Sequence, residues 1–167
     1  EIEVRKQLGW VRSKRNEYGP AVAQYRQVLD LARRVDDTRA ILTATGQLGL
    51  MAEAMGDLVE AERRYQATAA GMAQLGDPMF RAYYLGFQGR VALKLGRWDA
   101  GIALLREALG PKLPNKSMAD LYTLSLGCGL AFTRDVPGAE AVAGSITTLR
   151  DPAPTLPGAL ARGFAAV

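Results

Sequence analysis

The sequence contains no histidine and a single cysteine, Cys128. Histidine is the commonest general base and the commonest metal ligand in proteins, so its absence removes the usual centre of both kinds of site. One cysteine cannot form an internal disulfide or a structural zinc site, and no phosphate-binding loop or spaced set of carboxylates takes their place. We therefore expect a protein that is not an enzyme and that uses no metal or cofactor.

Long apolar runs and a strong charge of one sign are also missing. No uninterrupted apolar run reaches the roughly 18 residues that a membrane span needs, and no basic start followed by an apolar stretch marks a signal peptide. The net charge is +4 over 167 residues, which is modest, so we do not expect this domain to bind nucleic acid. We expect a cytoplasmic protein, and we interpret the start at Glu1 and the ending in mid-pattern as marks of a fragment of a longer or processed chain.

The feature that organises the chain is a repeat. Four glycines lie at successive intervals of 40 residues, and three further columns keep the same interval, one of small residues and two of bulky residues. An interval of this size is typical of a solenoid, in which helical hairpins stack because one hairpin cannot bury its own apolar face. The glycine column is Gly9, Gly49, Gly89 and Gly129, and the others are Ala21, Ala61, Gly101 and Ala141; Tyr18, Leu58 and Trp98; and Tyr25, Tyr65 and Leu105.

Local signals divide each repeat into two helices. Gly56 can adopt the left-handed conformation that ends a helix, and Asp57 can cap the helix that follows. Apolar residues at helical spacing, together with such breaks, predict helices over about 2–15, 19–35, 38–55, 58–75, 78–95, 98–109, 117–132 and 136–150. We expect a loop over 110–116, with Ser117 capping the helix after it, a linker over 151–157 and a partial capping helix over 158–167.

These columns resemble the tetratricopeptide repeat (TPR). That family places Leu-Gly in the first helix, Gly-Asp at the turn, and a small residue and an aromatic four apart in the second helix, as in Leu48-Gly49, Gly56-Asp57, Ala61 and Tyr65. The usual unit has about 34 residues, and the longer unit is similar to the repeats of large bacterial transcription regulators. The resemblance implies an all-α, right-handed superhelical solenoid of four hairpins plus a partial C-terminal capping helix. It would form one domain with repeats over about 2–36, 37–76, 77–115 and 116–150.

The resemblance also implies a binding surface, because the first helices of TPR hairpins line a concave groove that holds a partner. Cations and aromatic rings on such a surface would suit an acidic or carboxylate-bearing peptide. The family's contact columns fall on Lys6, Trp10, Lys14, Gln47, Leu50, Tyr83, Phe87, Arg90, Lys94 and Arg134.

Other interpretations of these residues stay open. Trp10, Tyr83 and Phe87 have the spacing of inter-helix core residues, and the cations could form an ordinary solvated face. TPR proteins that clamp a carboxylate use asparagines where this chain has Trp10, Leu50, Arg90 and Leu130, which argues against that kind of clamp. Two arginine pairs on second helices, Arg33-Arg34 and Arg63-Arg64, lie among acidic residues and favour helix-surface ion pairs over nucleic-acid contacts.

The sequence therefore leaves two main functions. The first is a protein–protein interaction module with a protein or peptide partner. The second is a sensor or oligomerisation segment of a larger bacterial transcription regulator. Self-association into a homo-oligomer through the end helices is a further alternative.

Overall fold

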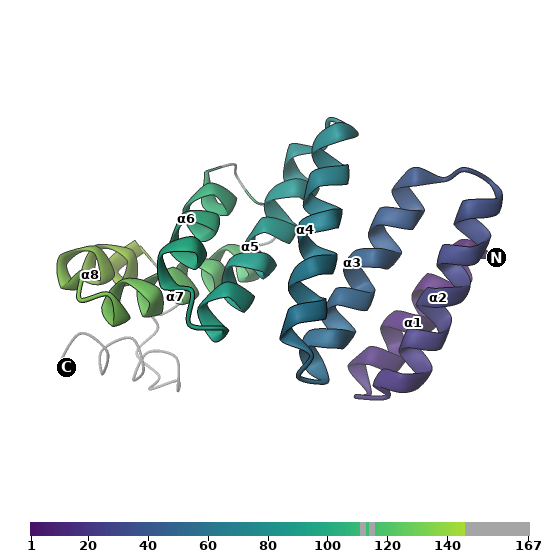
Figure 1. Cartoon of the computed structure of the whole chain (residues 1–167), viewed down its shortest axis with the longest axis horizontal. Coiled ribbons are helices and arrows are strands. Elements are labelled where there is room, and N and C mark those ends of the chain that lie inside the picture. The colour runs from purple at the N-terminus through teal and green to yellow at the C-terminus, as the bar shows by residue number, and fades with distance from the viewer. Residues whose placement is uncertain (111–112, 114–115, 146–167) are drawn as a thin grey trace. The chain divides into compact units, whose positions relative to one another are not determined.

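The computed structural model describes residues 1–110, 113 and 116–145 of the chain. All regular secondary structure in this part is helical (Figure 1). The elements are α1 (Ile2–Lys14), α2 (Tyr18–Arg34), α3 (Thr38–Ala54), α4 (Leu58–Gln74), α5 (Pro78–Lys94), α6 (Trp98–Leu109), α7 (Lys116–Phe132) and α8 (Val136–Ser145). The predicted order and type of these helices are confirmed, whereas the predicted linker, the capping helix and residues 146–150 lie outside the described residues.

A turn recurs every 20 residues, so each 40-residue repeat consists of two equal halves. Helices α2 to α6 begin at residues 18, 38, 58, 78 and 98. The turn before α4 has Gly56 at φ +87°, which is the left-handed conformation expected of it. The N–H of Asp57 then donates to the carbonyl of Ala52 at 2.9 Å, which closes the end of α3 as a Schellman turn.

Aspartates start three successive helices. Asp37, Asp57 and Asp77 each accept a hydrogen bond from the backbone N–H three residues later, at 2.9, 3.1 and 3.0 Å. These side chains satisfy N–H groups that the first turn of a helix leaves without a partner. The cap expected at Asp57 is confirmed.

Two predicted helix starts were wrong by a short distance. We expected the second helix to open at Gly19-Pro20, but α2 begins at Tyr18, so Pro20 lies within its first turn, where a missing N–H is tolerated. We expected Ser117 to cap the seventh helix, but α7 already begins at Lys116.

The glycine column allows close packing within the hairpins α1–α2 and α3–α4. A Cβ added at Gly9 would lie 2.9 Å from the ring of Tyr25, and one added at Gly49 would lie 2.8 Å from the ring of Tyr65. Both rings are buried, so each tyrosine packs directly on the backbone of the preceding helix. The columns at these positions are therefore columns of packing contacts.

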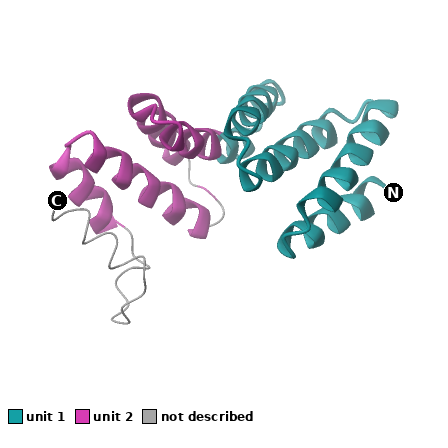
Figure 2. Cartoon of the chain, turned by 60° about the horizontal axis from the view of Figure 1, so that its bottom comes forward, with its two compact units in different colours: residues 1–84 teal, residues 85–167 magenta. Residues whose placement is uncertain are grey.

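The chain divides into two compact units, residues 1–84 and 85–167, with the boundary inside α5 (Figure 2). In the first unit the hairpin α1–α2, which we call hairpin 1, packs through α2 on α3 of the hairpin α3–α4, which we call hairpin 2. In the second unit α7 packs on both α6 and α8. None of the helices in the described part combines the length and apolarity that crossing a bilayer requires.

Candidate partner-binding groove

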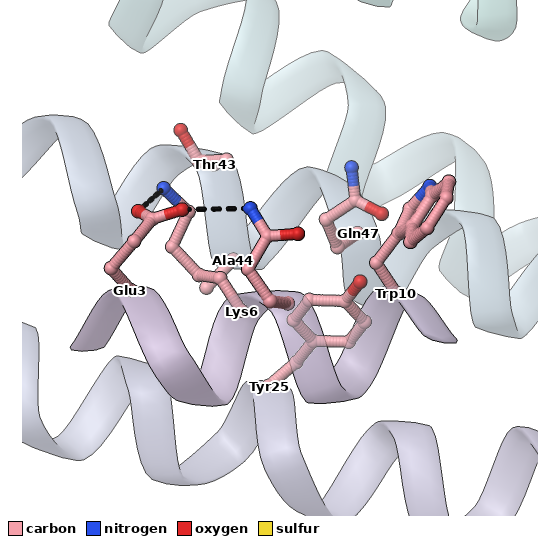
Figure 3. A pocket seen from close by; sticks show the side chains of 8 residues that line it. Glu3, Lys6, Trp10, Tyr25, Thr43, Ala44 and Gln47 are labelled. Atoms are coloured by element: carbon pink, nitrogen blue, oxygen red, sulfur yellow. Dashed lines mark hydrogen bonds and ion pairs between the residues drawn. The ribbon is translucent and has the colours of Figure 1, made fainter. Parts of the chain in front are cut away.

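A groove of about 280 Å³ lies between α1 and α3 in the first unit, with α2 below it (Figure 3). We call it the α1–α3 groove. Three of the ten predicted contact residues, Lys6, Trp10 and Gln47, line it. The full lining is Glu3, Lys6, Gln7 and Trp10 from α1, Tyr25 from α2, and Thr43, Ala44 and Gln47 from α3.

The groove lies where the chain departs from its own repeat. Between the next two first helices, the ring of Tyr84 in α5 packs on Gly46 in α3, so closely that a Cβ at Gly46 would lie 2.1 Å from it. The residues 40 positions earlier are Ala44 and Lys6. A flexible lysine beside a small alanine packs less completely than a rigid ring on a glycine, and this exchange leaves a hollow between α1 and α3.

Trp10 forms one end of the groove. Its side chain is 51% exposed, which is unusual for the largest apolar residue. The Nζ atom of Lys14 lies 5.8 Å from the centroid of its ring, within the range of a cation–π interaction. About half of the Trp10 side chain is thus open to solvent in the described structure, with the ammonium group of Lys14 beside its ring.

The floor of the groove carries a phenol without a hydrogen-bond partner among the described residues. In hairpin 2 the equivalent Tyr65 donates from its hydroxyl to Oε2 of Glu53 at 2.8 Å. In hairpin 1 the position of that glutamate is taken by Ser13, whose hydroxyl donates to the carbonyl of Trp10 instead. The hydroxyl of Tyr25 points into the groove (Figure 3), and burial raises its pKa to about 12, so it is a neutral donor and acceptor at physiological pH.

Glu3 brings into the groove an acidic side chain that was not among the predicted contact residues. Glu3 accepts hydrogen bonds from Nζ of Lys6 at 2.7 Å and from Nε2 of Gln7 at 2.9 Å, and these bonds lower the pKa of Glu3. The positive charge of Lys6 is therefore balanced inside the groove. The spacing of Glu3 and Lys6, three residues apart on a helix, is the signal that would have revealed the pair.

Two other predicted contact residues of the first unit lie away from the groove lining. Leu50 is half-buried and packs against the core of hairpins 1 and 2. Tyr83 is also half-buried, and its ring meets that of Tyr84 edge-on with the centroids 5.3 Å apart.

Phe87, which we expected to present an exposed ring, is 5% exposed and is a core residue. The ring of Tyr122 packs on the neighbouring Gly86 and meets Phe87 edge-on at 5.8 Å, so it covers Phe87. The guanidinium of Arg90 lies 5.7 Å from the centroid of the Phe87 ring. For Phe87 the core interpretation that the sequence left open is the correct one.

The remaining two predicted residues lie near helix ends of the second unit. Lys94 is exposed and is the last residue of α5. Arg134 was expected on the face of a first helix, but it lies in the turn between α7 and α8 with φ +62°. The structure thus brings together Lys6, Trp10 and Gln47, with Lys14 beside them, and it leaves the other predicted residues outside the groove.

Solved structures provide comparisons for the arrangement of the helices. BtubC (BKLC) from P. vanneervenii superposes with a TM-score of 0.77 at 14% identity, over 89% of this chain and 63% of that one. A kinesin-light-chain-like protein of Podosopora anserina with nearly identical TPR-like repeats superposes with a TM-score of 0.75 at 13% identity, over 99% and 83% of the two chains, and so does a single-residue variant of it. The fold is TPR-like.

The expected TPR-like, all-α repeat fold is therefore confirmed, and at these identities the likeness concerns the fold alone. The chain spans slightly less than two thirds of the length of BtubC. No protein-family model matches the sequence, and the comparison with curated proteins gives no match.

Proposed function

We propose that this chain is a protein–protein interaction module that holds a segment of a partner protein in the α1–α3 groove. The half-exposed ring of Trp10 at the end of the groove carries the proposal. Large aromatic side chains are enriched among the residues that dominate binding energy, and they act best next to a pocket from which a partner can displace water. TPR-like scaffolds are suited to this role because stacked hairpins present an extended surface to a partner.

The charges of the groove define the partner further. Lys6 is balanced by Glu3, whereas Lys14 has no acidic partner among the described residues and lies over the Trp10 ring. A carboxylate on the partner would gain a charge-assisted hydrogen bond from Lys14 at this end of the groove. The proposed partner segment is thus an apolar side chain next to an acidic residue or a terminal carboxylate.

Selection from a random peptide library on the purified chain tests the proposal. Peptides selected on the wild-type protein should lose roughly thirtyfold in affinity on Trp10→Ala, because truncating a central tryptophan typically removes about 2 kcal/mol or more. Val4→Ala is the matched control, because Val4 is an exposed apolar residue of the same helix outside the groove lining. Lys14→Glu should lower the affinity for acidic peptides and reduce its dependence on salt.

Either of two results would contradict this function. One is a set of selected peptides that bind the Trp10→Ala variant as tightly as the wild type. The other is a selection that yields no binders while light scattering shows the chain assembling with itself through the same face.

A further inference from the structure

A second cleft, of about 340 Å³, lies between α2 and α4 in the first unit. Its four ionisable lining residues are all arginines: Arg26 and Arg33 from α2, and Arg63 and Arg64 from α4. Leu29, Thr45, Leu48 and Ala67 complete the lining. We call it the arginine cleft.

The carboxylates around the arginine cleft do not balance its charge. Oε1 and Oε2 of Glu60 accept from both Arg63 and Arg64, with the shortest N–O distance 2.7 Å in each pair, so two guanidinium groups share one carboxylate. Arg33 lies 4.0 Å from Asp30, at the limit of an ion pair. Arg26 has no acidic partner among the described residues, so four guanidinium groups face two carboxylates and two positive charges remain.

Packing of the repeat does not require these arginines. The residues 40 positions later in the chain are Gln66, Ala73, Ala103 and Leu104, all of them uncharged. The repeat therefore folds at this position with neutral side chains. Four like charges around one cleft repel each other, and an anion between them would remove that repulsion.

The geometry points to a compact dianion as the occupant. Arginine is the side chain best suited to phosphate, because its planar fork can donate two parallel hydrogen bonds to two oxygens. An extended polyanion such as a nucleic-acid backbone would have to pass the carboxylates of Asp30 and Glu60, which flank the cleft on α2 and α4. A single phosphate group is small enough to contact Arg26 and Arg33 while it competes with Glu60 for Arg63 and Arg64.

We propose that the arginine cleft binds a phosphate monoester dianion, either on a free small molecule or on a phosphorylated side chain of a partner. The bound group would bridge hairpin 1 and hairpin 2, because Arg26 and Arg33 lie on one and Arg63 and Arg64 on the other. This site is separate from the α1–α3 groove, and no residue lines both.

Titration of the full chain with inorganic phosphate, followed by NMR of the arginine side-chain Nε–H groups, tests the site. Phosphate should shift the signals of Arg26 and Arg64, whereas chloride at matched ionic strength should not. The double variant Arg26→Gln with Arg33→Gln should lose at least tenfold in phosphate affinity. Arg15→Gln is the control, because Arg15 is an exposed arginine outside the cleft. The phosphate affinity of this variant should equal that of the wild type.

Glu60→Gln provides a test in the opposite direction. It removes the carboxylate that Arg63 and Arg64 share, so phosphate affinity should rise severalfold over that for chloride at matched ionic strength, and an unchanged phosphate affinity would contradict the site. Circular dichroism of each variant would show that the helices are retained.

Comparison of ligands identifies the source of the phosphate. Tighter binding of a phosphoserine peptide than of inorganic phosphate, lost in the double variant, supports a phosphorylated partner, and equal binding of the two supports a free small molecule. The proposal is overturned if phosphate and chloride act alike at equal ionic strength. It is also overturned if single-stranded DNA binds more tightly than phosphate through the same arginines.

Discussion

Replacing Gly46 with alanine tests whether ring-on-glycine packing holds hairpin 2 to the helix that follows it. A Cβ at this position would lie 2.1 Å from Cε1 of Tyr84, 2.3 Å from Cζ and 2.4 Å from the hydroxyl oxygen. The ring cannot move easily, because Tyr84 is buried and its ring lies against those of Tyr65 and Tyr83. The extra methyl group therefore has to displace a ring that is fixed on several sides.

The magnitude follows from two opposing effects. Alanine favours a helix interior over glycine by about 1 kcal/mol. Overpacking of a core costs about 1–3 kcal/mol, and an overlap this deep belongs to the upper part of that range. We expect Gly46→Ala to lower the free energy of unfolding by about 1–2 kcal/mol.

Urea unfolding followed by circular dichroism measures this change in the free energy of unfolding. Two variants serve as controls. Gly127→Ala, in the interior of α7, places a Cβ at an ordinary contact distance of 3.5 Å from Val142 and should be neutral or stabilising. In a Tyr84→Ala background the ring is gone, so Gly46→Ala should change sign and stabilise by up to about 1 kcal/mol. If Gly46→Ala stabilises the wild type as Gly127→Ala does, the ring of Tyr84 does not oppose a side chain at Gly46.

Two further predictions concern the helix starts. Hydrogen bonds from the backbone of Phe80 and from Arg39 lower the pKa of Asp77 below its ordinary value near 4. The ionised form therefore stabilises the fold above that ordinary value, and this stability is lost as the pH falls through the lowered pKa. Asp77→Asn should thus make the urea midpoint of unfolding less sensitive to acid. Asp57→Ala should lower the free energy of unfolding by about 1 kcal/mol in urea, because the N–H of Glu60 loses its acceptor; Asp57→Asn retains an acceptor and should lose much less.

The helices and their turns could be predicted from the sequence because they depend on local chemistry. A residue such as Gly56 that tolerates positive φ, followed by the capping Asp57, marks a helix boundary without any knowledge of the tertiary structure. The 40-residue interval extended that reasoning to the packing of Gly49 on Tyr65. The starts of α2 and α7 were predicted slightly too late because Pro20 and Ser117 are also compatible with positions just inside a helix.

The candidate site could be predicted only in part because it depends on which neighbour covers each helix face. Phe87 has the helical position of a groove residue, but the ring that covers it belongs to Tyr122, which lies 38 and not 40 residues after Tyr84. No column of the repeat reveals that contact. The Glu3–Lys6 pair could have been predicted from its spacing alone. This pair makes the groove less positive than expected.

Departures from the repeat are the better indication of function in this chain. A position that recurs, such as Gly9 and Gly49, is explained by packing, so its residue type says little about a partner. A residue that packing does not need has no such explanation, and Trp10 is one, because it is half exposed where Leu50 packs against the core. Arg63 is another, because the next repeat has Ala103 in its place. Both departures fall in hairpins 1 and 2, and each lines a cleft that the described residues leave open. Such positions can vary without altering the stacking of a solenoid, so they are the ones to test for a ligand.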